Sequence, residues 1–149
     1  MSKMKYVNSA TLTFPSVSQN ESLSRSFMSA FLMQTNPTVE EISDIKCAVS
    51  EAVTNAIVHG YRGTSGIVKL RAVLTEDMRV IIDVSDKGCG IENIEEAEKP
   101  LFTTDPGGER SGMGFTVMKT FTDKMKVTSK VGRGTKVRLI KKIGGDGTY

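Results

Sequence analysis

Glu51 and Asn55 are the two residues of this sequence whose types and spacing most directly suggest chemistry. The segment around them has helical periodicity, so residues four positions apart lie one turn from each other and their side chains point into the same space. A carboxylate and a carboxamide placed in this way can act together on a bound ligand. His59 follows Asn55 by the same step, and a capping or structural role accounts for it. A solvated polar face is the alternative for the pair, but the glycine pattern downstream favours a ligand site.

Three glycine-rich turns follow this segment, and each falls at a predicted junction of a strand, a loop or a helix. The turns are Asp86-x-Gly88-x-Gly90, Gly112-x-Gly114 and Gly132-x-Gly134-Thr135. Glycine lets the backbone approach a ligand closely and permits positive φ, so such clusters often line nucleotide sites. The second turn opens a predicted helix, where free N–H groups favour phosphate, and Arg110 before it can add a charge-assisted contact. Each turn alone also fits an ordinary structural glycine, and the sequence contains neither a Walker loop nor the eukaryotic-type kinase motifs.

The helix that carries Glu51 and Asn55 is predicted to begin at a capping box and to end at a glycine. Thr38 and Glu41 have the capping-box spacing. Gly60 stands where a left-handed C-cap is expected. The apolar residues between these ends recur with helical spacing and predict a stripe that faces the core, made of Ile45, Val49, Ala52, Val53, Ala56 and Ile57.

A strand over residues 6–14 and a first helix are predicted to precede this element. Ser18 and Glu21 have the spacing of a second capping box. Glu21 and Arg25 lie one turn apart, which by itself predicts only a surface ion pair worth under about 0.5 kcal/mol. The residues that this helix is predicted to bury are Leu23, Phe27, Ala30 and Phe31.

Strands over residues 67–75 and 79–85 alternate in hydrophobicity and are expected to pair antiparallel, and two more, over 126–131 and 135–142, flank a tight turn. A short acidic helix is expected over residues 92–98, a lid over 100–114, and a helix from there to about residue 124. The sum predicts an α/β fold, an α+β two-layer sandwich with helices on one face of a mixed, mostly antiparallel sheet. We expect a single domain over residues 1–143 and a disordered tail over 144–149.

The composition fits one globular domain and excludes several classes of protein. The 149 residues are 38% hydrophobic and 25% charged, with a formal net charge of +3. No basic stripe appears along the sequence, so no direct contact with nucleic acid is expected. No segment approaches the length of a membrane span, and no signal-peptide core is present, so no membrane contact and a cytoplasmic location are expected. Cys47 and Cys89 are too few for a disulfide scaffold or a metal site and are expected to be free thiols.

Taken in order, Glu51-x3-Asn55 and the three glycine turns resemble the ATP site of the GHKL superfamily, named for gyrases, heat-shock chaperones, histidine kinases and mismatch-repair ATPases. Longer stretches are similar to the anti-sigma F factors of spore-forming bacteria, and the similarity spans residues 18 to 139 approximately. The resemblance implies the GHKL, or Bergerat, ATP-binding fold, ATP and Mg²⁺ as cofactors, and a serine kinase that also inhibits a sigma factor. The stretches are Ser18-x-Asn20-Glu21-Ser22-x2-Arg25, residues 50–57 with His59-Gly-Tyr61, residues 100–104 and residues 109–116.

The resemblance also implies a role for each matching residue. Asn55 corresponds to the asparagine whose side-chain oxygen ligates Mg²⁺ on the ATP phosphates. Glu51 corresponds to the general base that accepts the proton of the attacking serine hydroxyl. Asp86 corresponds to the aspartate that accepts from the adenine amino group. The other residues implied to line the nucleotide site are Gly88 and Gly90 beside the base, Arg110, Gly112 and Gly114 at the lid and phosphates, and Thr135 on the floor of the adenine pocket.

The implied partners are the sporulation sigma factor F and an anti-anti-sigma factor, which is the substrate and competes for the same surface. The resemblance assigns partner contact to the stretch that holds Glu21 and Arg25, and it implies a homodimer. Three alternatives remain: an ATP-gated module that only sequesters a sigma factor, an anti-sigma kinase of the general stress response, and a detached histidine-kinase catalytic domain. The last lacks support, since the chain has no dimerisation helix with a phosphoacceptor histidine.

Overall fold

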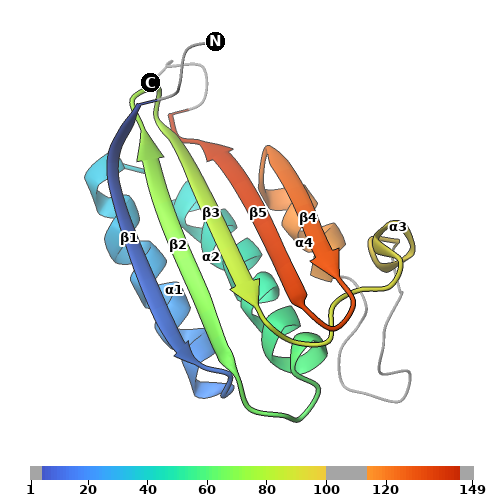
Figure 1. Ribbon diagram of the computed structural model, residues 1–149. Coiled ribbons are helices and arrows are strands. Elements are labelled where there is room, and N and C mark those ends of the chain that lie inside the picture. The colour runs from blue at the N-terminus through green and yellow to red at the C-terminus, as the bar shows by residue number, and fades with distance from the viewer. Residues whose placement is uncertain (1–4, 100–113, 145–149) are drawn as a thin grey trace.

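In the computed structural model, which describes residues 5–99 and 114–144, a five-stranded sheet is covered on one face by helices (Figure 1). In chain order, the elements are β1 (Tyr6–Pro15), α1 (Gln19–Leu32), the 3₁₀ turn η1 (Met33–Thr35), α2 (Val39–Thr54), the π-helical turn η2 (Asn55–Gly60), β2 (Ile67–Thr75), β3 (Arg79–Asp86), α3 (Ile94–Ala97), α4 (Gly114–Phe121), β4 (Lys124–Lys130) and β5 (Gly134–Lys142). The predicted two-layer α/β class is confirmed.

The strands of the sheet lie in the order β1-β2-β3-β5-β4, and every neighbouring pair is antiparallel. The predicted hairpin of β2 and β3 is present, with Leu70 opposite Val84. The sheet that the sequence predicts to be mixed is therefore antiparallel throughout the part of the chain that the structure describes. In Figure 1, β5 lies between β3 and β4, so the strand nearest the C-terminus occupies an interior position.

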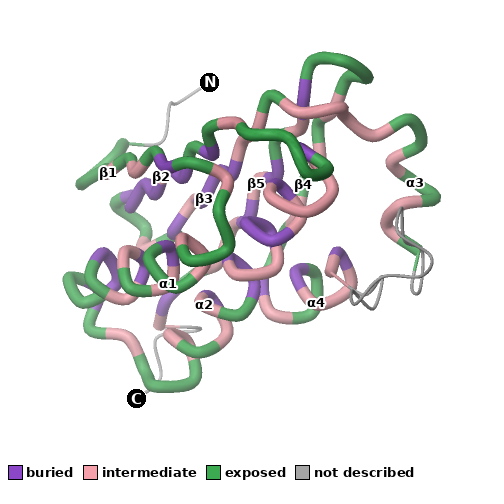
Figure 2. The backbone as a smooth tube through the Cα atoms, turned by 90° about the horizontal axis from the view of Figure 1, so that it is seen from below, coloured by how far each residue is buried: buried purple, intermediate pink, exposed green. Residues whose placement is uncertain are grey.

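The core lies between the sheet and the helices, where buried residues gather in Figure 2. Alternate residues of the strands face the helices because side chains on a strand point to opposite sides in turn. The stripe predicted on α2 and the turn after it is confirmed, with Ile57 at its half-buried margin. The fully buried side chains of the core include Met28, Leu32, Ile45, Leu70, Ile82, Met118 and Leu139.

The buried face of α1 differs from the predicted one. Leu23 is 45% exposed and Ala30 is exposed, whereas Ser24, Met28, Phe31 and Leu32 are buried. Phe27 packs at the margin of the core. The helix is therefore rotated by about one residue relative to the prediction, and its buried face includes the small Ser24, whose hydroxyl donates to the carbonyl of Glu21 at 2.6 Å.

The two predicted capping boxes have different outcomes. At the start of α2 the box is present, because Thr38 Oγ1 accepts from Glu41 N at 3.0 Å and Glu41 Oε1 accepts from Thr38 N at 2.8 Å. At the start of α1 it is absent, because Ser18 is itself helical and its side chain makes no capping hydrogen bond. Glu21 turns instead towards α2, where Thr54 donates to it.

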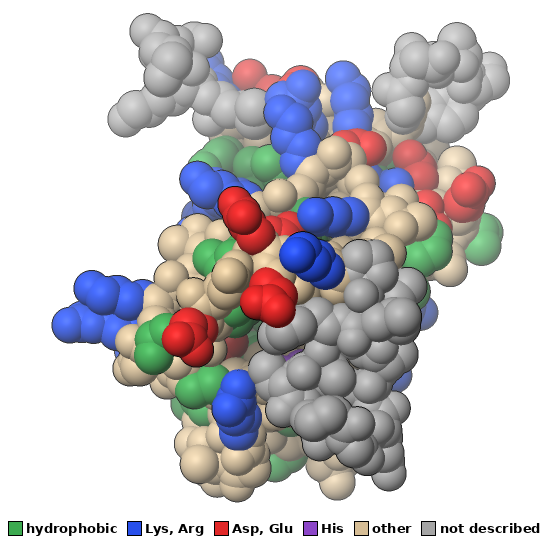
Figure 3. All heavy atoms as spheres, turned by 90° about the vertical axis from the view of Figure 1, so that its right-hand side faces the viewer, with side chains coloured by type: hydrophobic (Ala, Val, Ile, Leu, Met, Phe, Trp, Pro, Cys, Tyr) green, Lys and Arg blue, Asp and Glu red, His purple; other side chains and the backbone are tan. Residues whose placement is uncertain are grey.

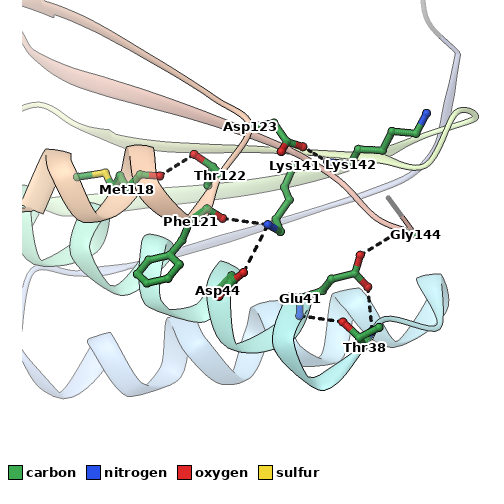
Figure 4. A network of polar contacts seen from close by, with 10 residues as sticks. All are labelled: Thr38, Glu41, Asp44, Met118, Phe121, Thr122, Asp123, Lys141, Lys142 and Gly144. Carbon is green, nitrogen blue, oxygen red and sulfur yellow. Dashed lines mark hydrogen bonds and ion pairs between the residues drawn. The ribbon is translucent and has the colours of Figure 1, made fainter. Parts of the chain in front are cut away.

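A polar network ties the end of β5 to α2 and α4 at the edge of the core (Figure 4). Lys141 Nζ donates to the carbonyl of Phe121 at 3.2 Å and lies 3.6 Å from Asp44 Oδ2. A cation at this place is favourable because the last carbonyls of α4 lack intrahelical partners. Gly144 N donates to Glu41 Oε2 at 2.8 Å, so the predicted disordered tail does not begin at this residue. The rest of that tail, residues 145–149, lies outside the described residues.

Candidate functional site

Glu51, Asn55 and Gly114 converge where α2 meets the start of α4. A methyl group added at Gly114 would lie 3.2 Å from Asn55 Oδ1, 3.3 Å from Asn55 Nδ2 and 3.3 Å from Glu51 Oε2. The predicted neighbourhood of Glu51 and Asn55 is thus present, and both side chains meet at the backbone of Gly114. A Cβ at this position would make unusually tight contacts, so Asn55 or Glu51 would have to move by a few tenths of an ångström.

The helix does not end at Gly60 in the predicted way. Beyond Thr54 it widens into the π-helical turn Asn55–Gly60, and its left-handed residues are Arg62, at φ 45°, and Gly63, at φ 80°. Gly60 has another function, because a Cβ on it would lie within 2.8–2.9 Å of the Asp86 carboxyl group. π-Helical turns often occur at functional sites, and this one carries Asn55 at its start.

Asp86 ends β3 beside this turn, with its carboxylate directed towards the helical layer. Its Oδ1 atom accepts from Gly88 N at 2.9 Å. Burial raises the pKa of Asp86, and hydrogen bonds from the backbone N–H groups of Gly88 and Thr135 partly offset this effect. A carboxylate that is part-buried and already shares two donors has little water around it, which suits recognition of a ligand amine.

Gly88 and Gly90 let the loop after Asp86 pass against two other segments. A Cβ on Gly88 would lie 2.0 Å from the carbonyl oxygen of Gly60, and Cys89 N donates to that oxygen at 2.8 Å. Gly90, at φ 79°, has the carbonyl of Lys130 where a Cβ would be. The loop therefore has no room for side chains at either glycine.

Thr135 lies opposite Asp86 in the β3–β5 pairing and belongs to the same wall of the site. Its hydroxyl lies 2.7 Å from that of Ser129. Ser129 also accepts from the backbone N–H of Ile91 at 2.7 Å, which links the loop after Asp86 to β4. The role of Thr135 on the floor of an adenine pocket stays a prediction.

Tyr61 is a positioning residue to which the sequence analysis assigned no role. Its side chain is buried, its hydroxyl donates to the carbonyl of Ile67 at 2.6 Å, and it accepts from Lys87 N at 2.9 Å. The ring occupies the space where a Cβ of Gly66 would stand. The sequence shows an aromatic residue directly after His59-Gly60, but its spacing does not predict the hydrogen bonds of Tyr61 with Ile67 and Lys87.

Glu21 and Arg25 are half-buried and contact α2, which corrects the expectation of a plain surface pair. Thr54 Oγ1 donates to Glu21 Oε1 at 2.7 Å, and Arg25 Nη1 donates to Ser50 Oγ at 3.0 Å. Ser50 and Thr54 directly precede Glu51 and Asn55 in the sequence, and nothing in their spacing singled them out.

Arg110, Gly112 and the rest of the predicted lid up to residue 113 lie outside the described residues (grey in Figure 3). Cys47 and Cys89 are free thiols, as predicted. Within residues 5–99 and 114–144 there is no group of three or more His, Cys, Asp or Glu side chains that could hold a metal ion. In the same residues, no helix combines the length and apolar character needed to cross a bilayer.

Comparisons with known proteins place this site in context. The family model for the histidine kinase-like ATPase domain matches residues 14–141. The anti-sigma F factor of Thermoanaerobacter sp. (strain X514) is 53% identical over 143 residues, covering 96% of this chain and 99% of the relative. That of Clostridium acetobutylicum is 53% identical over 136 residues, covering 91% and 94%.

Solved structures agree at the level of the fold. The RsbU and RsbW domains of a Mycobacterium tuberculosis protein superpose with a TM-score of 0.68 at 19% identity, over 92% of this chain and 33% of that one. A blue-light activated histidine kinase of Erythrobacter litoralis gives a TM-score of 0.59 at 25% identity, over 76% of this chain and 34% of that one.

Proposed function

The chain belongs to the histidine kinase-like ATPase domain family and, within it, to the anti-sigma F factors, and on this premise we propose that it is an ATP-dependent serine kinase of an anti-anti-sigma factor that also binds and inhibits the sporulation sigma factor F. Membership of an ATPase-domain family implies an ATP site. Phosphotransfer to serine, the two protein partners and a homodimer are the proposed parts. We treat residues 1–143 as the single domain that performs both tasks.

The observation that carries the proposal is the convergence of Glu51 and Asn55 on Gly114. An ATP-binding module needs the asparagine, the aspartate and the glycines, but it has no need of a second acidic group beside the asparagine. Glu51 supplies that group, and its Oε2 atom lies as close to the Gly114 position as the Asn55 amide does. A base next to the phosphate-binding end of the site is what phosphotransfer to a hydroxyl requires.

The residues fit ATP with Mg²⁺. At Gly114 a Cβ would crowd the Asn55 amide, so glycine leaves that amide more room to bind a ligand. Asn55 Oδ1 would hold Mg²⁺, which is usually bound by one or two protein oxygens together with phosphates and water. When bound, Mg²⁺ neutralises charge on the phosphates. No larger protein cluster is needed for this, so the absence of one among the described residues is compatible with the proposal.

Each residue then has a defined task in the proposed reaction. Asp86 accepts a hydrogen bond from the adenine amino group, while Gly88 and Gly90 keep the loop close to the base. Glu51 accepts the proton of the substrate serine as its oxygen bonds to the γ-phosphorus and the bond to the ADP oxygen breaks. The start of α4 at Gly114 directs unpaired backbone N–H groups towards the phosphates.

A second candidate is the non-catalytic module that holds a sigma factor only when ATP is bound. The contacts of Glu21 and Arg25 with α2 favour a link between partner binding and the nucleotide site in either case. An anti-sigma kinase of the stress response would share the same site, and the similarity to anti-sigma F factors over 96% of the chain favours the sporulation branch.

The test is transfer of labelled phosphate from Mg-ATP to the anti-anti-sigma protein of the same organism. Wild-type protein, Glu51→Gln and the matched surface variant Glu92→Gln are compared, with ATP binding measured in each. We expect serine phosphorylation by wild type and Glu92→Gln, and a rate lower by roughly 10²–10⁴-fold in Glu51→Gln with ATP binding retained. ATP binding without transfer by the wild type would leave the non-catalytic module as the function.

A further inference from the structure

The sheet forks at the end of β3, where Asp86 lies. On one side, β3 stays paired with β5 as far as Asp86. On the other side, its pairing with β2 ends one residue earlier, at Ser85 opposite Lys69. If the ladder continued, Ile67 and Lys87 would face each other two residues further on, because the strands run in opposite directions. Strand pairing therefore holds Asp86 on one side only.

The hydroxyl of Tyr61 occupies the gap between β2 and β3 at this fork. It donates to the carbonyl of Ile67 at 2.6 Å and accepts from Lys87 N at 2.9 Å. In a continued ladder, a direct N–H···O bond would bring the two backbone atoms to about 2.9 Å. Two hydrogen bonds in series hold them further apart, so the chain after β3 can turn towards η2. In Figure 1 the turn from α2 into β2 lies at the same end of the sheet as the tip of β3.

The ring of Tyr61 is fixed by its surroundings, so the position of its hydroxyl is defined. Tyr61 is only 7% exposed. Gly66 lies against the ring, because a Cβ added there would stand 2.0–2.6 Å from three of the ring carbons. Gly66 is itself anchored, since its N–H donates to Ser16 Oγ at 3.0 Å and its carbonyl accepts from Ser16 N at 2.9 Å. At the end of η2, Tyr61 N donates to the carbonyl of Ala56 at 3.1 Å.

The backbone and the side chain of Tyr61 both act on the surroundings of Asp86. Gly60, the residue before Tyr61, packs against the Asp86 carboxyl group, which would lie 2.8–2.9 Å from a Cβ at Gly60. The Tyr61 hydroxyl binds Lys87 N, which belongs to the peptide group that follows Asp86. A change in that peptide group also moves Gly88, whose N–H donates to Asp86 Oδ1 at 2.9 Å. Tyr61 therefore determines where the carboxylate oxygens of Asp86 lie.

We propose that the Tyr61 hydroxyl sets the base selectivity of the nucleotide site, favouring a purine with a 6-amino group over a purine without it. The inference rests on the proposed function, in which Asp86 accepts from the adenine amino group. The carboxylate favours that amino group only where an oxygen lies in line with the amino N–H, because a hydrogen bond weakens steeply away from linear geometry. Tyr61 acts through the backbone on either side of Asp86, so it is a positioning residue and not a catalytic one.

The test is calorimetric titration of the nucleotide-free protein with Mg-ATP and with the Mg²⁺ complex of purine riboside triphosphate, which lacks only the 6-amino group. The wild type should bind ATP about 10-fold or more tightly than the analogue, as expected for a hydrogen bond to a charged group. Tyr61→Phe keeps the ring and removes the hydroxyl, so this preference should fall by about 5-fold. The matched control, Tyr6→Phe, makes the same chemical change at a residue of β1 that is 57% exposed, and it should keep the full preference.

A second variant displaces the hydroxyl without removing it. Gly66→Ala places a methyl group in the space of the Tyr61 ring, so the ring must move and the preference for ATP should fall here too. Nuclear magnetic resonance of the nucleotide-free protein gives a readout that needs no ligand. The amide resonances of Lys87 and Gly88 should shift in Tyr61→Phe and stay in place in Tyr6→Phe. Urea unfolding verifies the fold of each variant.

The inference is overturned if Tyr61→Phe keeps the wild-type preference for ATP, or if it weakens binding of both nucleotides equally, as a purely structural role would. It is also overturned if the Lys87 amide resonance does not move in Tyr61→Phe. A wild type that binds neither nucleotide would contradict the proposed ATP site and this inference with it. Full preference for ATP without phosphotransfer would overturn only the proposed kinase activity.

Discussion

The carboxylate of Glu21 on α1 accepts a hydrogen bond from the hydroxyl of Thr54 on α2 at 2.7 Å. One turn away, Arg25 donates to Ser50 at 3.0 Å. The two α2 residues of this ladder directly precede the residues that converge on Gly114. The proposed partner residues on α1 are therefore hydrogen-bonded to the α2 residues that directly precede the proposed catalytic pair.

Replacing Thr54 with valine should lower the free energy of unfolding by about 1 kcal/mol, because Glu21 loses a donor with little change in volume. Urea denaturation measures the change. The control is Thr120→Val on the exposed side of α4, where the lost hydroxyl donates only to the carbonyl of Thr116. If the free energy of unfolding fell equally in the two variants, the hydrogen bond between Thr54 and Glu21 would contribute no more than an exposed bond within one helix.

Arg25→Ala should weaken binding to both proposed protein partners while ATP affinity stays the same, since Arg25 contacts α2 through Ser50 and not through Glu51 or Asn55. Ser50→Ala serves as the matched variant, because it keeps the guanidinium and removes only its anchor. Calorimetry with each partner gives the affinities. Unchanged partner affinity in Arg25→Ala would return this residue to a purely structural role.

Gly114→Ala should separate stability from activity. Alanine favours the helix over glycine by up to about 1 kcal/mol, so the fold should not weaken. The added methyl group would stand 3.2–3.3 Å from Asn55 and Glu51, so ATP binding and phosphotransfer should fall. Gly63→Ala is the opposite control, since nothing lies near its Cβ but its φ of 80° is strained for alanine. Full phosphotransfer in Gly114→Ala would contradict the geometry of the site.

Asp86 should give the protein an unusual pH dependence. Burial raises the pKa of Asp86 in the folded chain, so the folded state holds its proton more tightly than the unfolded state does. Stability of the nucleotide-free protein should therefore decrease as pH rises from the ordinary aspartate pKa, about 3.9, through the raised value. Nucleotide binding needs the carboxylate and should weaken as pH falls through the same range. Asp86→Asn should abolish both effects in unfolding and binding titrations.

Glu41 should give the stability of the protein the opposite dependence on pH. Burial works against its ionisation, but hydrogen bonds from the backbone of Thr38 and Gly144 and from the Thr38 hydroxyl, with the charge of Lys141, together lower the pKa of Glu41. The contribution of ionised Glu41 to the stability of the folded chain is complete above the ordinary glutamate pKa, about 4.3. It is lost as pH falls through the lowered pKa. Glu41→Gln keeps a capping acceptor but does not titrate, so its thermal stability should fall less steeply in acid. Parallel curves for the two proteins would contradict this.

Local signals in the sequence predicted the parts of the fold that depend on few residues. The capping box at Thr38 and Glu41, the hairpin of β2 and β3 and the stripe on α2 all follow from spacing within one or two turns. The meeting of Glu51 and Asn55 was predictable for the same reason, because both lie on one helix.

Tertiary contacts decided the rest. Ser18 and Glu21 have the same spacing as Thr38 and Glu41, but a hydroxyl of α2 binds Glu21 and the box does not form. The sequence indicates that a helix ends at Gly60. In the structure this position requires glycine because the Asp86 carboxyl group lies where a Cβ would be.

The strand order β1-β2-β3-β5-β4 determines how late in synthesis the sheet can be completed. The ribosome releases β3 and β4 before β5, so β3 has a bare edge until synthesis reaches Gly134. Thr135 and the backbone N–H that supports Asp86 are both delivered by that strand. A nascent chain that stops short of β5 already contains Glu51 and Asn55 but lacks Thr135, the proposed floor of the nucleotide site. Premature termination before Gly134 would therefore yield a fragment that lacks one wall of the proposed nucleotide site.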